Sequence, residues 1–180
     1  MDYVTRGEFD LLQQQLRSDP GEGFAAFRAI PRILDRSYLG SLVPSNGAWQ
    51  TFYTYTGRGG LLYPDRVLDL ALITGRVNND GALRTFTLRA QINGVTILTA
   101  TPGSIADGTD TQDRVTFRLL AGGSNANQLV TLESTFASTF DFAAAAEDMS
   151  AEWVLTLDVQ WSVSSVNLSW ARHHALLTLS

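Results

Sequence analysis

One stretch of strict alternation, residues 153–161, constrains the fold of this chain more than any other feature of the sequence. Its large apolar side chains occupy every second position: Trp153, Leu155, Leu157, Val159 and Trp161. Successive side chains of a β-strand point to opposite faces, so these five share one face, and most of the positions between them are polar. The pattern predicts an antiparallel strand with one face in a hydrophobic core and the other toward solvent.

Further strands are indicated by the same alternation or by clusters of aromatic and β-branched residues. They cover residues 49–55, 67–73, 85–92, 95–98, 115–119, 128–136 and 168–179. Asn93-Gly94 predicts a type I′ hairpin turn between two of them. About eight short strands with turn-rich connections are typical of sandwiches, so we expect a mainly β fold over residues 48–180: an antiparallel β-sandwich with jelly-roll-like topology. The alanine-rich stretch 141–151 is expected to insert one helical turn.

Residues 1–20 form a separate zone in which the periodicity predicts a short N-terminal α-helix. Thr5 and Glu8 fit a capping box, and Phe9, Leu12 and Leu16 recur at spacings of three and four. An isolated helix of this length is marginal in water, so its apolar stripe requires a partner surface. Folding back onto the sandwich, self-association into a short bundle and docking on a neighbouring protein all remain open.

Residues 21–47 predict an extended arm that is rich in apolar side chains. The most prominent are Phe24, Phe27, Ile30, Ile33 and Leu34. Pro31 interrupts any helix here. The segment is too apolar for a free linker, so we expect it to lie against its own domain or a partner subunit. Together with the helix stripe, these residues form the predicted protein interface.

Charge and composition limit the classes of partner. The formal net charge is -5, and the 13 basic residues are all arginine and scattered, whereas nucleic-acid binding needs concentrated positive charge. No apolar run approaches the ~20 residues that span a bilayer, and residues 1–6 lack the basic start of a signal peptide. The sequence contains no cysteine, which excludes disulfides and thiol chemistry. We expect a protein made in the cytoplasm, with neither a nucleic-acid nor a membrane partner.

Residues that carry chemistry are few. No motif of a catalytic or cofactor site occurs, so neither enzymatic activity nor a cofactor is expected. His173 and His174 are adjacent and would point to opposite faces of a regular strand, so we interpret them as structural rather than metal-binding. Asp107, Asp110 and Asp113 lack the spacing of an EF-hand and predict a solvated loop rather than a calcium site.

Exposed aromatic side chains would allow a different role, the stacking of sugar rings. The candidates are Trp49, Tyr53, Tyr55 and Tyr63. Trp153 and Trp161 are expected in the core instead, because they share a face with aliphatic residues.

Two segments carry a resemblance to a known group of proteins. Residues 3–12, Tyr-Val-Thr-Arg-Gly-Glu-Phe-Asp-Leu-Leu, resemble the short helical headpieces of tailed-bacteriophage virion proteins. Residues 153–179 are similar to the last strand pair of phage β-sandwich modules, which occur in capsid cement or decoration proteins and in fibre proteins. The resemblance implies a virion location, a homo-trimer, and the major capsid protein or another virion protein as partner.

Two roles follow from this resemblance. In the first, the chain is a capsid cement or decoration protein that binds shell subunits through its N-terminal helix and arm. In the alternative, it is a tail-fibre or adaptor protein whose sandwich binds a receptor or carbohydrate. No catalytic residue carries over from the resemblance.

Overall fold

The structure is a computed structural model that describes residues 31–38, 42–62, 66–124, 126–136 and 139–180. The expected N-terminal helix lies outside these residues, as do six of the predicted interface side chains. Those six are Phe9, Leu12, Leu16, Phe24, Phe27 and Ile30. The described chain forms one compact unit that spans Ile33–Leu179.

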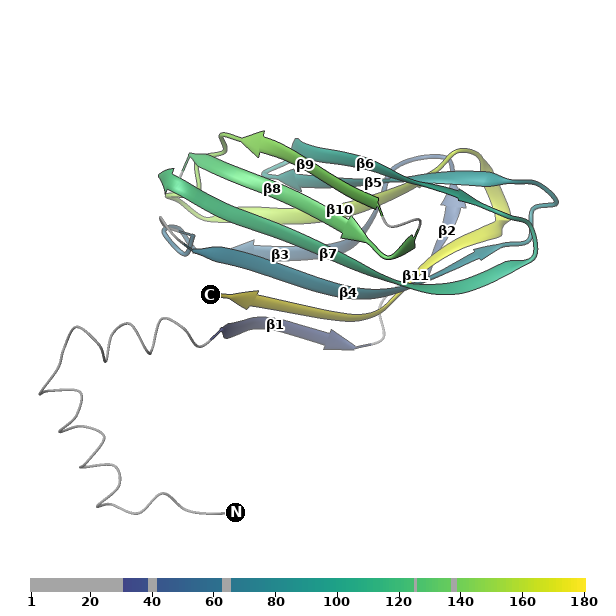
Figure 1. The fold of residues 1–180 in the computed structure, drawn as a ribbon, viewed down its shortest axis with the longest axis horizontal. Coiled ribbons are helices and arrows are strands. Elements are labelled where there is room, and N and C mark those ends of the chain that lie inside the picture. The colour runs from purple at the N-terminus through teal and green to yellow at the C-terminus, as the bar shows by residue number, and fades with distance from the viewer. Residues whose placement is uncertain (1–30, 39–41, 63–65, 125, 137–138) are drawn as a thin grey trace, which may run out of the picture. The chain divides into compact units, whose positions relative to one another are not determined.

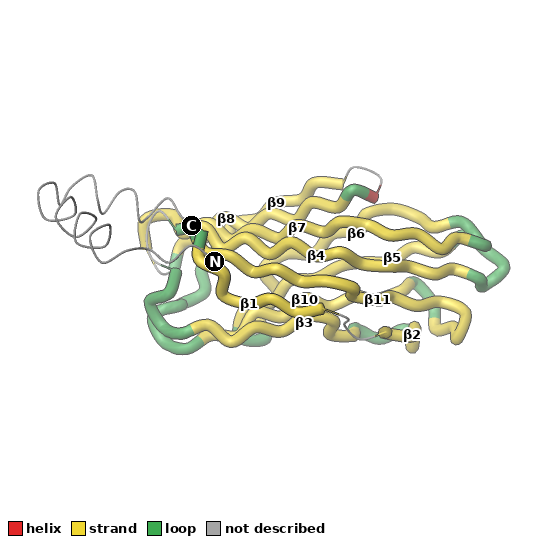
Figure 2. Tube along the Cα trace, turned by 90° about the horizontal axis from the view of Figure 1, so that it is seen from below, coloured by secondary structure: helices red, strands yellow, loops and turns green. Residues whose placement is uncertain are grey.

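Eleven strands account for most of the described residues. They are β1 (Arg32–Tyr38), β2 (Leu42–Asn46), β3 (Gln50–Gly57), β4 (Val67–Asn78), β5 (Arg84–Ile92), β6 (Val95–Ile105), β7 (Thr109–Ser124), β8 (Asn127–Ser134), β9 (Thr139–Ala145), β10 (Trp153–Trp161) and β11 (Ser164–Leu179). The loops gather at the two ends of the strands (Figure 2).

The strands form two antiparallel sheets that pack as a sandwich, as the alternation in the sequence predicted. The large sheet has the order β1-β11-β4-β7-β8-β9, with β2 also paired to β11, and the small sheet has the order β3-β10-β5-β6. Figure 1 shows the two sheets face to face, with β9 at one margin of the large sheet and β1 at the other. The mainly β prediction is confirmed.

The connectivity is that of a jelly roll with an insertion. Four nested antiparallel pairs, β2–β11, β3–β10, β4–β7 and β5–β6, alternate between the sheets. Eight strands arranged in this way make the double Greek key of a jelly roll. Strands β8 and β9 are additional, since they lie between β7 and β10 in the chain and extend the large sheet beyond β7.

The core lies between the sheets, where the alternating residues of the strands meet. Trp153, Leu155 and Val159 on β10 are each 0% exposed, and they face Leu68, Leu70 and other apolar side chains of the large sheet. Asn93 and Gly94 both have positive φ, 52° and 80°, which is the type I′ geometry predicted for the β5–β6 hairpin.

The alanine-rich stretch differs from the sequence-based expectation. Residues Thr139–Ala145, which overlap the stretch 141–151 that was expected to insert a helical turn, form strand β9. There, pairing with β8 decides the conformation over local propensity. Residues Arg32–Tyr38 and Leu42–Asn46 of the expected arm are strands of the large sheet, so this part of the arm lies against its own domain, one of the two predicted alternatives.

Candidate interaction surface

The exposed apolar side chains of the described residues are unevenly distributed between the two sheets. Seven of the nine large ones belong to strands of the large sheet: Ile33, Tyr38, Ile73, Leu129, Phe140, Phe142 and Val166. An antiparallel sheet that faces water normally shows polar side chains on that side. The large sheet is therefore the candidate interaction surface.

Strand register places several of these residues in rows across the outer face of β7, β8 and β9. One row runs Thr116, Glu133, Phe140, and the next runs Arg118, Thr131, Phe142. A shallow groove of about 520 Å³ opens between these strands. It is lined by Arg114, Thr116, Arg118, Glu133, Ser134, Thr135 and Phe140.

The charges in this groove are partly paired. Arg118 Nε donates to Asp69 Oδ2 on β4 at 3.0 Å, and this hydrogen bond is the largest cause of the raised pKa of Arg118. The Arg114 side chain has no ion-pair or hydrogen-bond partner among the described residues. The groove thus combines an available guanidinium with an aromatic wall, which suits contact with another protein.

Strand β9 is the free margin of this surface. It pairs with β8 over its whole length, and no backbone hydrogen bond joins its other side to any described residue. Phe140 and Phe142 are 56% and 70% exposed, with ring centroids 6.3 Å apart. The strand contains no proline, lysine or bulge, and its one charged residue, Asp141, stands in the row of the buried Leu132.

On the outer face of the small sheet, a cluster of polar side chains is hydrogen-bonded internally. Arg89 donates from Nε and Nη2 to Asp158 Oδ2 at 2.9 and 2.7 Å, and Thr51 Oγ1 donates to Asp158 Oδ1 at 2.7 Å. The Arg89 guanidinium stacks over Trp49, with Cζ 4.3 Å from the ring centroid. These groups satisfy one another and offer little to a partner.

A buried ionic cluster lies in the core. Arg76 is 1% exposed, and its Cζ lies 4.1 Å from the Phe136 ring centroid and 5.3 Å from that of Phe86. Asp113 accepts hydrogen bonds from the hydroxyls of Ser134 and Thr135. Burial lowers the pKa of Arg76, and the nearby Asp113 carboxylate opposes that shift. Aromatic faces and a carboxylate are the partners that a desolvated guanidinium needs, so this cluster is structural.

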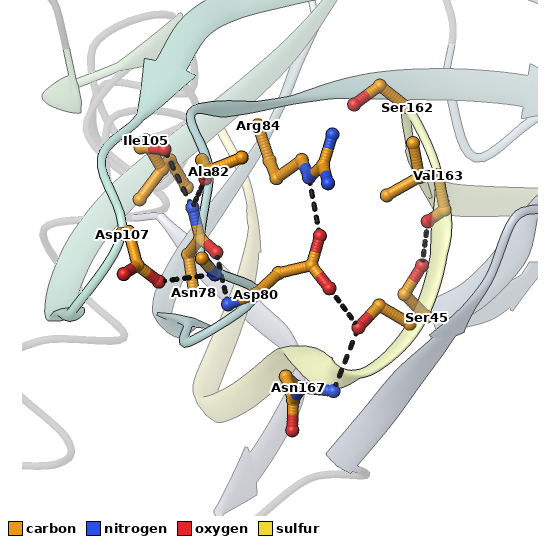
Figure 3. Close-up of polar contacts among 12 residues, drawn as sticks. Ser45, Asn78, Asp80, Ala82, Arg84, Ile105, Asp107, Ser162, Val163 and Asn167 are labelled. Atoms are coloured by element: carbon orange, nitrogen blue, oxygen red, sulfur yellow. Dashed lines mark hydrogen bonds and ion pairs between the residues drawn. The ribbon is translucent and has the colours of Figure 1, made fainter.

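Figure 3 shows a polar cluster at the loop end of the sandwich. Asp80 accepts hydrogen bonds from Arg84 Nε and Ser165 Oγ, both at 2.5 Å. The bond from Ser165, and then the bond from Arg84, lower the pKa of the Asp80 carboxyl. The contact with Ser165 ties the β4–β5 loop to the start of β11.

The same cluster reaches the β6–β7 loop. Asn78 Nδ2 donates to the carbonyl oxygens of Ala82 at 2.9 Å and Ile105 at 2.8 Å. Asp107 accepts the backbone N–H of Gly81 at 2.8 Å, whereas Asp113 is buried in the core cluster. Nowhere in the described part of the chain do three His, Asp or Glu side chains gather as a metal site.

The two histidines do not lie on opposite faces, because β11 bulges at His173. The register with β4 shifts between Arg172 and His174. His173 covers the outer side of Gly75, where a Cβ would meet its Nε2 at 2.5 Å. His174 packs on Tyr38 of β1 with ring centroids 4.9 Å apart. The bulge brings both imidazoles to the outer side of the large sheet.

Two of the predicted interface residues are described, and both lie on β1. Ile33 is 52% exposed, whereas Leu34 is half-buried against the core. Tyr53 Oη donates to Asp35 Oδ2 at 3.0 Å, which connects β1 to the small sheet. Burial, with a smaller effect of Asp35, raises the pKa of the Tyr53 phenol.

The aromatic residues considered for sugar stacking do not form an exposed platform. Tyr53 is buried, Tyr55 packs against Trp153 with ring centroids 5.8 Å apart, and Trp49 lies under Arg89. Tyr63 lies outside the described residues. The groove residues and the two phenylalanines of β9 were not identified from the sequence as interface candidates. The alternation of Phe140 and Phe142 around Asp141 is the feature that could have indicated a strand here.

The fold and its surface define a class: an antiparallel, jelly-roll-like β-sandwich whose larger sheet carries most of the large exposed apolar side chains of the described residues. No protein-family model and no curated protein matches the sequence. No helix in the described ranges is long and apolar enough to cross a membrane.

Several solved structures show distant similarity. VP2 in the subviral particle of infectious bursal disease virus matches with 13% identity and a TM-score of 0.40, over 84% of this chain and 33% of that chain. Lectin I from Ulex europaeus, solved with the methyl glycoside of α-L-fucose, matches with 11% identity and a TM-score of 0.36, over 81% and 92%. Arcelin-5, a lectin-like defence protein from Phaseolus vulgaris, matches with 12% identity and a TM-score of 0.35 over the same shares. The chain spans about a third of the length of the viral chains.

Proposed function

We propose that this chain is a non-enzymatic virion structural protein of a tailed bacteriophage, and specifically a capsid cement or decoration protein. The observation that carries the proposal is the uneven distribution of exposed apolar side chains, most of which belong to the large sheet. On the outer face of the small sheet, Arg89 and Asp158 are paired with each other. Exposed apolar side chains that lie together on a folded domain, as Phe140 and Phe142 do, favour contact with another protein. The phage-like segments at residues 3–12 and 153–179 supply the virion context.

In this proposal the shell contact is centred on residues 1–30 and continues onto β1. Those residues contain the apolar stripe Phe9, Leu12, Leu16, and β1 adds the exposed side chain of Ile33. An interface of this kind requires about 800 Å² from each partner. The partner is the major capsid protein or another virion protein, and the interaction stabilises the particle by burying apolar surface that both proteins otherwise expose to water.

The experiment compares attachment of full-length variants to particles that lack this protein. The triple substitution Phe9→Asp, Leu12→Asp, Leu16→Asp is expected to abolish co-sedimentation with the particles. The matched control carries the same three charges at Gln14, Gln15 and Ser18, which the helical periodicity places off the stripe, and it should attach normally. Equal attachment of both variants would contradict the proposal.

Copy number distinguishes the shell role from a tail role. We expect purified particles to contain hundreds of copies of the chain, measured by quantitative gel electrophoresis against the major capsid protein. A few dozen copies or fewer would point to the tail-fibre or adaptor role instead.

A further inference from the structure

The exposed phenylalanines of β9 lie on an edge strand that is complementary to itself. We infer that β9 of one copy pairs in antiparallel fashion with β9 of a second copy, so that the large sheets of two molecules join into one. The first support is the free margin: among the described residues, β9 is hydrogen-bonded on its β8 side only, over Thr139–Ala145. An exposed edge strand is a template for strand addition.

The second support is the register that a two-fold axis at Phe142 would give. Phe142 is the midpoint of β9, so Thr139 would face Ala145 of the second copy and every residue of the strand would be paired. Phe140 would face Ala144, a large side chain opposite a small one. Side chains opposite each other in an antiparallel pair share one face of the sheet, so Phe140 and Phe142 of both copies would lie on the same face.

Charge selects this register over its neighbours. An axis at Asp141 would place two carboxylates directly opposite each other, which is unfavourable in a sheet. An axis at Ala143 would leave Phe140 facing a position beyond the end of the partner strand. With the axis at Phe142, Asp141 faces Ala143 of the second copy, and neither problem arises.

The same register accounts for the third exposed residue of the extension. Leu129 on β8 is 44% exposed and pairs with Ala144 on β9. In the joined sheet, Phe140 of the second copy would lie beyond Ala144 in the same row, close to Leu129. Leu129, Phe140 and Phe142 of both copies then form one continuous apolar stripe on the outer face.

The surface available limits how strong this pairing is. The exposed fractions of Phe140, Phe142 and Leu129 amount to roughly 300 Å² of apolar surface per copy. Specific stable interfaces bury about 1,200–2,000 Å² in total, so the two edges together supply about a third to a half of such an interface. We therefore expect weak self-association in dilute solution that becomes substantial when copies are held side by side on a particle.

The inference extends the proposed function to contacts between copies. The two are tested apart, because self-association is measured on the purified full-length chain without particles. Sedimentation equilibrium over a wide concentration range should show a monomer–dimer transition. Phe142→Asp should weaken dimerisation at least about tenfold, because it removes a central aromatic residue and adds facing charges. Leu83→Asp is the matched control, since Leu83 is 65% exposed and lies in the β4–β5 loop outside both sheets, and its dimerisation should be unchanged.

Two further variants test the register. Ala144→Phe adds apolar surface, so dimerisation by non-specific adhesion would become stronger. The proposed pairing predicts the opposite, a loss of dimer affinity of at least about tenfold, because the added phenyl ring would collide with Phe140 of the second copy. Phe142→Cys should form a disulfide-linked dimer under mild oxidation, since facing Cα atoms lie about 4.5–5.5 Å apart. The natural chain contains no cysteine, so Leu83→Cys is a clean control that should form no disulfide-linked dimer.

Clear results would overturn the inference. One is a monomer at all concentrations together with no cross-link through position 142. Another is stronger association of Ala144→Phe. A third is a trimer that persists in Phe142→Asp, which would assign self-association to another part of the chain.

Discussion

The Nη2 atom of Arg76 lies 3.7 Å from Oδ2 of Asp113, and both side chains are 1% exposed. Nε and Nη1 of the same guanidinium have no hydrogen-bond partner among the described residues. The charge is compensated by the carboxylate and by the rings of Phe136, Phe86 and Trp170. This arrangement makes the cluster sensitive to the loss of either charged partner.

Arg76→Ala should therefore lower the free energy of unfolding by about 3–5 kcal/mol, because it leaves the Asp113 carboxylate buried without its cation and opens a cavity. Urea denaturation followed by tryptophan fluorescence measures the change. Arg76→Met is the matched variant, since it refills the volume, and it should be less destabilising than alanine. Equal stability of Arg76→Ala and the natural chain would contradict this view of the cluster.

The Arg89–Asp158 pair on the small sheet predicts a coupling between two substitutions. Asp158 is 2% exposed and accepts from Arg89 and Thr51. Asp158→Ala should cost about 2–4 kcal/mol because it removes charge-assisted hydrogen bonds from a desolvated site. In a double-mutant cycle with Arg89→Ala, the two losses should add to more than the loss in the double variant. Strict additivity would show that the two side chains do not interact.

Gly57 and Gly75 form a matched pair for testing close packing. A Cβ at Gly57 would lie 2.1 Å from Cζ2 of Trp153, a ring that is 0% exposed and enclosed by the core. Gly57→Ala should thus destabilise the fold by about 1–3 kcal/mol through overpacking. At Gly75 the obstacle is the end of the exposed His173 side chain, which can rotate away, so Gly75→Ala should have the smaller effect in thermal denaturation. The opposite order would be inconsistent with this packing.

Asp80 predicts a pH dependence of stability at the loop end of the sandwich. The hydrogen bond from Ser165, and then that from Arg84, lower its pKa in the folded state. The contribution of Asp80 is therefore complete above the ordinary aspartate pKa of about 3.9 and is lost as the pH falls through the lower, folded-state pKa. The difference in thermal midpoint between the natural chain and Asp80→Asn should shrink on acidification across that window.

A serine pair provides the control for this titration. Ser165→Ala removes the main cause of the lowered pKa, so it should move the acid limb of the stability curve toward higher pH. Ser162→Ala removes only an acceptor for the N–H of Thr85 and should leave the acid limb in place. Identical acid limbs in all variants would exclude Asp80 as the titrating group.

The sequence was most informative where one strand is buried on one face only. The alternation of residues 153–161 has the bounds of β10, although Asp158 on its outward side is buried, and Asn93-Gly94 forms the expected hairpin turn. The two-sheet sandwich follows from such patterns because a period of two specifies which face is buried. The strand boundaries were predicted less accurately, since β4 continues to Asn78. Its residues Thr74, Arg76 and Asn78 are buried, whereas their polar character predicts exposure to solvent.

The candidate surface was not predictable from local pattern. Alanine favours helices, so Ala143, Ala144 and Ala145 suggested a helical turn, yet pairing with β8 makes them part of a strand. The buried position of Arg76 depends on Asp113 and Phe136, which are distant in sequence and meet only in the folded sheet. Likewise, the side on which His173 lies depends on a bulge, which inserts one residue and leaves no clear signature in the sequence.

The insertion of β8 and β9 has a consequence for how this protein can diverge. The four nested strand pairs are complete without these two strands, so the outward-facing residues of the hairpin can change while its inward residues Val130, Leu132 and Ser134 keep their buried positions. Its outer strand and β1 occupy opposite margins of one sheet and belong to separate parts of the chain. Mutations can therefore change the binding specificity of one margin while that of the other is preserved, which allows a single small domain to gain binding partners one at a time.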